Sequence, residues 1–202
     1  MTPLGALITF FPAFVALLGA GCGGWLVLRP GWLPVAAGLT TFYLLPLAAY
    51  RLHGWWFPLR EGGSRLVGGY SAWYGGHQIQ AIYLTLPVLE SLLRLVPGLY
   101  SAWLRLWGAK VGRGVYWTPQ VEIIDRGLLE IGDRVVFGYR SGVVSHVIRP
   151  SKGNLLLYVG KVRIGDRAFI GAGSYLGPGV TVAAGAMVPA TTHVFPRAKV
   201  SA

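Results

Sequence analysis

Histidine is the side chain in this sequence best suited to moving a proton, because its ordinary pKa of about 6.5 lies near neutral pH. The chain has four histidines, His53, His77, His146 and His193. A zinc hydrolase site needs three imidazoles on one metal, and only His146 and His193 fall in the C-terminal half of the chain, at an unsuitable spacing. The one cysteine, Cys22, excludes internal disulfides and a cysteine-rich metal site. We therefore expect no metal, and ask which elements position these imidazoles.

Apolar residues recur at every sixth position near the C-terminus. They are Ile164, Ile170, Leu176, Val182, Val188, Val194 and Val200, and most are followed by Gly or Ala. A period of six fits neither a helix of 3.6 residues per turn nor a continuous two-residue alternation. It is typical of short strands joined by corners, with one aliphatic side chain pointing inward on each side. The spacing predicts a parallel β-helix.

The repeat begins earlier but is interrupted twice. Val111, Trp117 and Ile123 are in step, the register slips by two residues, and the pattern resumes at Ile131, Phe137 and Val143. From Val143 to Ile164 there are three extra residues beyond whole hexads, so we expect an inserted loop within 148–161, where Pro, Ser, Gly and Asn favour turns. Loops that interrupt a solenoid commonly form its binding face. Asp133 and Asp166 are predicted to be turn residues that bind their own backbone.

The N-terminal part is strongly apolar. The whole chain is 53% hydrophobic and only 12% charged, about half the charged fraction of a typical soluble domain. Residues 1–28 and 30–50 carry no charge, and Arg29 alone separates them. Each run can cross a hydrocarbon layer of about 30 Å as a helix, with kinks at Pro12 and Pro46. We predict a transmembrane hairpin with its turn near 29–31.

Flanking charge orients this hairpin. Arg51, Arg60 and Arg65 follow the second span, against Arg29 alone in the turn. Positive residues favour the cytoplasmic side, so both termini are expected there.

Residues 66–89 are also uncharged, and a third span is one reading. Helical spacing of apolar residues favours helices lying in the membrane interface instead; the residues are Ile79, Ile82, Tyr83, Leu86, Leu89 and Leu93. A second short helix is predicted over 99–107, ended by Gly108. We expect Arg94 and Arg105 to face lipid phosphates. Leu95, Trp103, Leu106 and Trp107 are expected to sit in lipid.

The net charge of +11 has three readings. Nucleic-acid binding is not expected, because no basic cluster alternates with aromatic residues and no nucleic-acid motif is present. A basic surface beside anionic lipid head groups is the simplest explanation. An anionic ligand is the third, since residues 111–202 carry 11 basic and 5 acidic side chains.

Two sets of residues resemble a known family. The string from Leu104 to Val115 resembles the start of the coil in bacterial hexapeptide-repeat acyltransferases. The strings 128–133, 145–146 and 162–165 are similar to the membrane-associated C-terminal domains of polylysine-synthetase-like peptide synthetases and related stand-alone acetyltransferases. The resemblance covers about residues 100–202. It implies a left-handed β-helix enzyme that uses acyl-coenzyme A.

The resemblance also implies site residues. His146 lies in a regular coil just before the inserted loop, where the family places its general base, while His193 is the less favoured candidate. Asp125, in a bulged coil, is the favoured partner for the imidazole over Glu122 and Glu130. The family binds pantetheine and the oxyanion through backbone amides, so the amides of Gly171, Ala172 and Gly173 are candidates for that role. The segment from Pro196 to Val200 resembles a family element near the nucleotide, so Arg197 and Lys199 are candidates for contacting its phosphates.

We therefore expect a mainly β protein, with a transmembrane hairpin over 1–60, interfacial helices over 61–108 and a left-handed β-helix over 109–202. The expected function is membrane-anchored O- or N-acyl transfer from acyl-CoA, with acetyl-CoA as the expected donor, to a membrane-associated acceptor. The expected assembly is a homotrimer in the cytoplasmic membrane with the β-helix on the cytoplasmic side, in contact with membrane lipid and open to a membrane-protein partner. The alternative is a non-catalytic β-helix scaffold in a larger membrane complex.

Overall fold

The computed structural model describes residues 2–66, 68–151 and 153–202, and its contacts divide the chain into two compact units. The helical unit comprises Met1–Leu59 and Gly68–Leu89. The coil unit comprises Arg60–Val67 and Glu90–Ala202.

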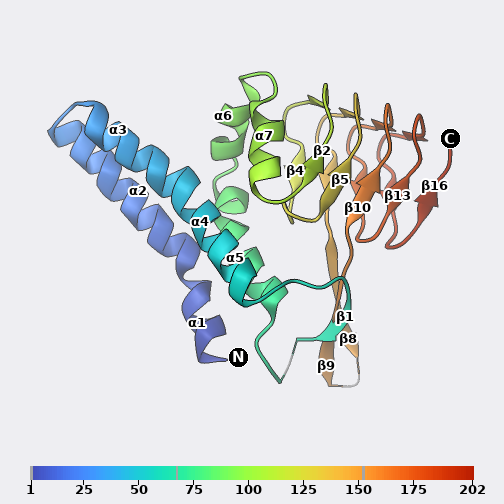
Figure 1. Cartoon of the computed structure of the whole chain (residues 1–202), viewed down its shortest axis with the longest axis horizontal. Coiled ribbons are helices and arrows are strands. Elements are labelled where there is room, and N and C mark those ends of the chain that lie inside the picture. The colour runs from blue at the N-terminus through green and yellow to red at the C-terminus, as the bar shows by residue number, and fades with distance from the viewer. Residues whose placement is uncertain (1, 67, 152) are drawn as a thin grey trace. The chain divides into compact units, whose positions relative to one another are not determined.

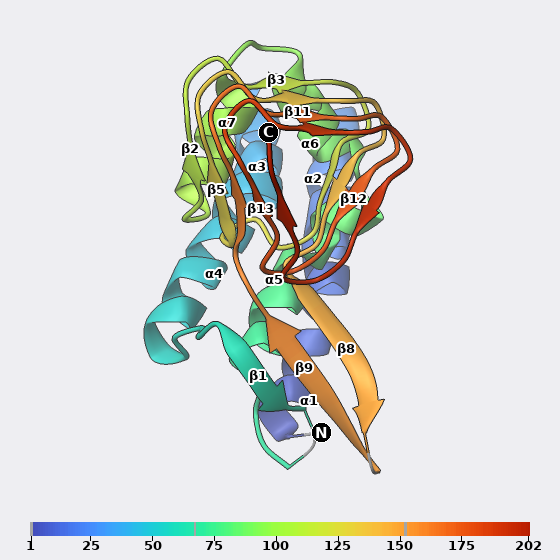
Figure 2. The ribbon, with the colours of Figure 1, turned by 90° about the vertical axis from the view of Figure 1, so that its right-hand side faces the viewer.

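Short parallel strands form the three sides of the coil unit (Figure 2). The first side contains β2 (Lys110–Val111), β5 (Leu129–Ile131), β10 (Val162–Ile164), β13 (Thr181–Val182) and β16 (Lys199–Val200). The second contains β3 (Tyr116–Trp117), β6 (Val136–Phe137), β11 (Phe169–Ile170) and β14 (Met187–Val188). The third contains β4 (Glu122–Ile123), β7 (Gly142–Val143), β12 (Tyr175–Leu176) and β15 (His193–Val194).

The six-residue pattern predicted the core of this coil correctly. Ile170 and Leu176 are fully buried, and Val182 and Val188 are each 1% exposed. Val194 is only half-buried, as expected near an end where stacking stops. The description "mainly β" is wrong for the whole chain, because helices precede β2 and make up about 40% of the residues.

Two aspartates join neighbouring coils. The Oδ1 atom of Asp166 accepts a hydrogen bond from the amide of Asp133 (2.8 Å), and Oδ1 of Asp133 accepts one from the amide of Arg113 (2.7 Å). The prediction that these side chains bind their own turn is therefore wrong. A parallel coil places the same corner directly above itself, so the nearest amide belongs to the preceding coil. Gly132 completes this packing, since a Cβ there would overlap Asp166.

Helix α7 (Leu99–Leu106) lies against the first coil (Figure 1). Arg105 donates from Nε to the carbonyl of Val111 and from Nη2 to that of Gly112, both at 2.8 Å. Trp103 and Trp107 are 5% and 1% exposed. The expectation that these tryptophans sit in lipid and that Arg105 faces phosphates is wrong, because the first coil offers unpaired edges that need a cap.

Arg94, the last residue of helix α6 (Val88–Arg94), also serves the coil unit. Its Nη2 donates to the carbonyl of Val121 (2.7 Å), and its guanidinium lies 4.2 Å from the centre of the Tyr100 ring. Arg94 therefore binds protein rather than lipid phosphate. Leu95 and Leu106 remain exposed.

The helical unit contains two long apolar stretches. The first joins α1 (Pro3–Thr9) and α2 (Phe11–Leu28). The second joins α3 (Trp32–Leu39), the π-helical segment η1 (Thr40–Leu44) and α4 (Leu45–Trp56). Each is long and apolar enough to cross a membrane, and little of either is buried. The turn between them falls at residues 29–31, as predicted.

Helix α5 (Ala72–Thr85) confirms the predicted helical spacing, but its apolar residues face protein. Ile79, Ile82 and Tyr83 are each at most 2% exposed, and the helix contacts α1, α2 and α4. Pro46 lies within the second stretch, where the sequence predicts a kink. Proline has no amide hydrogen to donate to the carbonyl four residues earlier, that of Phe42, and the hydroxyl of Tyr83 donates to this carbonyl (2.7 Å).

The insertion in the coil is a β-hairpin rather than an irregular loop. Its strands are β8 (His146–Ser151) and β9 (Asn154–Val159), and β1 (Gly62–Arg65) adds a third antiparallel strand beside β9 (Figures 1 and 2). The hairpin begins two residues before the predicted start of the loop. The sequence predicts that His146 lies in a regular coil. In the structure it is instead the first residue of β8.

Candidate active site

Asp125 and His146 are brought together at one corner of the coil unit. Oδ2 of Asp125 lies 2.7 Å from Nδ1 of His146. Asp125 follows β4, in the segment where the register slips by two residues, and His146 leaves the next coil directly above. The slip gives the corner enough chain to turn the carboxyl group toward the hairpin. The pairing of Asp125 with His146 is thus present as an observed contact.

The carboxylate of Asp125 is held by a second donor. The amide of Ser145 donates to the same Oδ2 atom (3.0 Å), and the hydroxyl of Ser145 donates to the carbonyl of Leu128 (3.1 Å). Ser145 is fully buried and Asp125 is 3% exposed, whereas the side chain of His146 retains 16% exposure. The carboxylate is therefore fixed while the imidazole stays accessible.

This arrangement defines which ring nitrogen can act as a base. A carboxylate beside Nδ1 favours the tautomer with hydrogen on Nδ1, which places the lone pair of neutral His146 on Nε2. The same carboxylate stabilises the imidazolium that forms when Nε2 accepts a proton. Geometry of this kind suits general-base catalysis.

Two residues that the sequence did not single out support the corner. Arg126 is fully buried, and its Nε and Nη2 atoms pair with Oε1 and Oε2 of Glu90 at 2.7 and 3.0 Å. The guanidinium also donates from Nη1 to the carbonyl of Ile124 (3.4 Å). Glu90 lies 36 residues earlier in a helix, so no local spacing indicated this pair.

The competing carboxylates are placed elsewhere. Glu122 is exposed on β4. Glu130 forms ion pairs with Lys110 (3.4 Å), Lys161 (3.5 Å) and Arg163 (3.2 Å) on the first side of the coil. Burial by itself would raise the pKa of Glu130, but Lys110 foremost, together with Arg163 and Lys161, outweighs it, and the pKa lies below the ordinary value.

The other histidines make different contacts within their own units. His193 is exposed on β15, with its ring stacked on that of Tyr175 at 5.6 Å between centroids. In the helical unit, Nε2 of His53 lies 2.6 Å from the hydroxyl of Tyr70. The ring of His77 stacks on Trp73 at 5.0 Å.

The candidate cofactor residues do not meet within one chain. Gly171, Ala172 and Gly173 form the corner between β11 and β12, whereas Arg197 lies in the corner between β15 and β16 and Lys199 is in β16. The amides of Gly171 and Gly173 already donate to the carbonyls of Val188 and Tyr139, both at 2.8 Å. The expectation that these two amides face a ligand therefore does not hold, since the coil ladder uses them.

Comparison with known proteins places the chain near acetyltransferases. No protein-family model matches it. Over 139 residues it is 28% identical to the Bacillus subtilis protein named "Putative acetyltransferase YvoF", covering 59% of this chain and 75% of that protein. The match confirms the resemblance to acetyltransferases. The narrower resemblance to polylysine-synthetase-like domains stays a prediction.

Solved structures of lower sequence identity match part of the chain. A hexapeptide-repeat acetyltransferase from Vibrio cholerae, complexed with acetyl-coenzyme A, is 16% identical with a TM-score of 0.41, covering 62% of this chain and 84% of that one. A galactoside acetyltransferase in complex with coenzyme A is 14% identical with a TM-score of 0.40, covering 59% and 75%.

Proposed function

We propose that this chain, like the acetyltransferases it resembles, transfers an acyl group from acyl-CoA to a hydroxyl or amine acceptor. The acyl donor is acetyl-CoA, in keeping with the name of the Bacillus subtilis relative. The observation that carries the proposal is the contact of 2.7 Å between Oδ2 of Asp125 and Nδ1 of His146. No residue of the proposed mechanism requires a metal.

The proposed reaction uses His146 twice. Nε2 of His146 accepts the proton of the acceptor as the acceptor oxygen or nitrogen attacks the thioester carbonyl. Asp125 keeps the ring oriented and stabilises the imidazolium. The tetrahedral intermediate collapses with cleavage of the carbon–sulfur bond, and His146 returns the proton to the departing thiolate. The products are the acylated acceptor and free coenzyme A.

We further propose that the helical unit anchors the enzyme in the cytoplasmic membrane as a transmembrane hairpin. Support comes from two stretches of 26 and 25 residues, in each of which an apolar window of 18 residues is only 17% or 11% buried, respectively. Leu17, Val27 and Leu28 are each more than 70% exposed, which in water would be costly. Arg51, near the C-terminal end of the second stretch, and Arg60, after it, favour a cytoplasmic coil unit. An anchored enzyme would act on a membrane-borne acceptor.

We also propose that the chain has three parts, 1–60, 61–108 and 109–202, and that its coil is left-handed. The assembly that we propose is a homotrimer. The trimer is supported by the placement of two candidate cofactor residues, since Ala172 lies between β11 and β12 whereas Lys199 lies in β16. Coils packed side by side would let the corner at Ala172 in one subunit face Lys199 of another, so that acyl-CoA could contact both residues. Lys199 would then reach the phosphates by charge.

The test is thioester cleavage by the purified full chain. Acetyl-CoA and a lipid extract that contains acceptors are added, and release of coenzyme A is followed with a thiol reagent. His146→Ala should lower turnover about 100-fold or more, whereas His193→Ala, the matched control, should retain wild-type turnover. Equal release from wild type and His146→Ala would remove His146 from the mechanism. Failure to bind acetyl-CoA, with recovery in a stable hetero-oligomer, would favour the scaffold alternative.

A further inference from the structure

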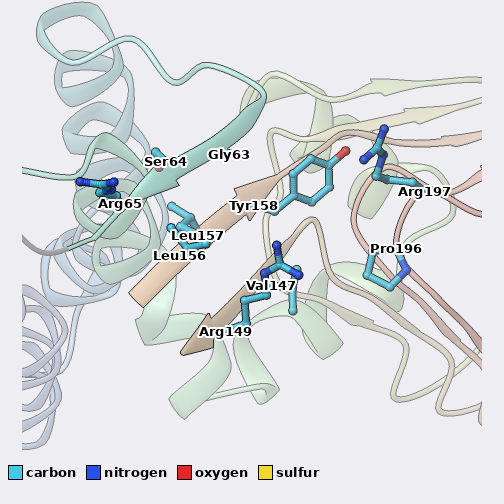
Figure 3. A pocket seen from close by; sticks show the side chains of 10 residues that line it. All are labelled: Gly63, Ser64, Arg65, Val147, Arg149, Leu156, Leu157, Tyr158, Pro196 and Arg197. Atoms are coloured by element: carbon cyan, nitrogen blue, oxygen red, sulfur yellow. The ribbon is translucent and has the colours of Figure 1, made fainter. Parts of the chain in front are cut away.

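A cavity of about 590 Å³ lies between the three-stranded sheet β1–β9–β8 and the corner after β15 (Figure 3). Three arginines are among its lining residues, Arg65, Arg149 and Arg197. The phenol ring of Tyr158 and apolar side chains such as Leu156 complete the lining, and the described lining residues include no carboxylate. The cavity volume lies within the range of about 300–1,000 Å³ that is usual for small-molecule sites.

Strand register explains why these residues converge. Arg65 on β1 and Arg149 on β8 both stand opposite Leu156 on β9. Residues directly opposite one another in a sheet share a face, so the two arginines flank Leu156 on one side of it. Gly63 and Val147 flank Tyr158 in the same way, and Gly63 leaves room beside the ring because no atom lies near its missing Cβ.

The cavity lies on the face of the hairpin opposite to the candidate active site. His146 precedes Val147, and successive side chains of a strand point to opposite faces. His146 therefore shares the other face with Val159, which stands opposite it and is 2% exposed. Binding of a ligand in this cavity is therefore independent of the proposed acyl transfer.

The three arginines differ from the other basic residues near them. Arg163 is paired with Glu61 and Glu130. In the part of the chain that the structure describes, no carboxylate comes within 4.0 Å of the guanidinium of Arg65, Arg149 or Arg197. A chain with only seven acidic residues thus leaves a positive charge of three around one cavity.

Tyr158 adds a donor to this cluster. Its side chain points toward Arg197 in Figure 3, and the guanidinium carbon of Arg197 lies 5.9 Å from the ring centre. The phenol oxygen rests beside Gly160 and Gly179, where a Cβ would come within about 3.0 Å of it. Small residues at both positions keep the phenol in place at the rim.

We propose that this cavity binds the phosphate group of a lipid. Guanidinium groups bind phosphate through charge-assisted and often bidentate hydrogen bonds, and the hydroxyl of Tyr158 can donate another. The apolar lining of Val147 and Leu156 suits the start of an acyl or isoprenoid chain, which a free phosphate would not need. The ligand class is therefore a phosphate-bearing amphiphile.

The experiment is calorimetric titration of the purified full chain, in a phosphate-free neutral detergent, with dihexanoyl phosphatidate. Dihexanoylglycerol, which lacks the phosphate, and glycerol 3-phosphate, which lacks the chains, are titrated in parallel. Phosphatidate should bind more tightly than either. Arg149→Gln and Arg197→Gln should each weaken its binding by about tenfold or more. His146→Ala should leave it unchanged, which separates this site from the proposed acyl transfer.

Two variants control for general loss of charge. Arg113→Gln removes an exposed arginine from a different corner, between β2 and β3. Arg167→Gln matches Arg197→Gln in backbone conformation, since Arg167 and Arg197 have φ values of 57° and 66°. Both controls should bind as the wild type does. Equal weakening in the controls would show diffuse attraction and overturn the proposal, as would tight binding of coenzyme A with no binding of phosphatidate, or no binding at all.

Discussion

Arg126 and Glu90 form a two-pronged ion pair inside the coil unit, with both side chains almost completely removed from solvent. The pair holds the residue directly after Asp125, so it anchors the corner that carries the candidate orienting carboxylate. A buried charge that loses its partner is costly, because no water replaces the missing interaction.

Breaking this pair should destabilise the fold strongly. Arg126→Met leaves Glu90 buried without its main cation, and we expect a loss of about 3–5 kcal/mol in the free energy of unfolding. Denaturant unfolding in detergent measures it. Lys110→Met is the matched control, because Lys110 is an exposed partner of Glu130 with 79% of its side chain accessible, and it should cost less than about 1 kcal/mol. Similar losses for both variants would show that the buried pair has no special role.

Asp125→Asn tests orientation of the imidazole separately from its presence. The amide keeps the size of the carboxyl group but removes the charge that stabilises the imidazolium of His146. We expect the turnover number to fall about 100-fold or more with little change in the KM for acetyl-CoA. Steady-state release of coenzyme A gives both values.

The double variant provides the control. If Asp125 acts only through His146, then Asp125→Asn should have little further effect on an enzyme that already carries His146→Ala. A further large loss in that background would contradict the positioning role and assign Asp125 a separate function.

The coil was predictable because its period is local and repeated. Ile164, Ile170 and Leu176 each occupy the same inward position of the repeat. An ambiguous hexad can therefore be assigned from its neighbours. The Asp125–His146 contact was predictable for a related reason, since a bulge and an insertion at the same corner of adjacent coils must lie near each other. The antiparallel hairpin was not predicted as such, because its turn residues indicate only where the chain reverses.

Long-range partners were not predictable from spacing. The pairing of β1 with β9 joins residues nearly 100 positions apart, and Gly62–Arg65 carries no strand-like alternation that would reveal it. Likewise, the sequence around Arg94 and Arg105 does not show whether these arginines bind lipid phosphates or carbonyls of the coil. Only the exposed edge of the first coil, a property of the folded chain, decides between these partners.

Acid should weaken the coil unit partly through Glu130. Its pKa is lower in the folded state than its ordinary value because Lys110, Arg163 and Lys161 favour the carboxylate. The folded state therefore binds the proton less tightly than the unfolded state, and the stabilisation present above pH about 4.5 is lost as the pH falls through the folded pKa. Glu130→Gln should flatten this part of the curve of unfolding free energy against pH. If the unfolding free energies of wild type and Glu130→Gln fall in parallel from pH 6 downward, Glu130 does not contribute to the acid sensitivity.

The hydrogen bond from Tyr83 to the carbonyl of Phe42 predicts an interaction between two substitutions that touch different residues. Tyr83→Phe should cost about 1 kcal/mol of unfolding free energy, because it leaves that carbonyl without its donor. Pro46→Ala supplies a backbone amide that can take over the donation, so Tyr83→Phe should cost less in the Pro46→Ala background. A double-mutant cycle measured by unfolding in detergent gives the difference.

Thr85→Val is a suitable control, because the hydroxyl of Thr85 donates to the carbonyl of Ala81 within its own helix. Loss of this hydroxyl should cost the same unfolding free energy with or without Pro46. A Tyr83→Phe cost that is likewise independent of Pro46 would show that the phenol does not replace the donor that proline removes.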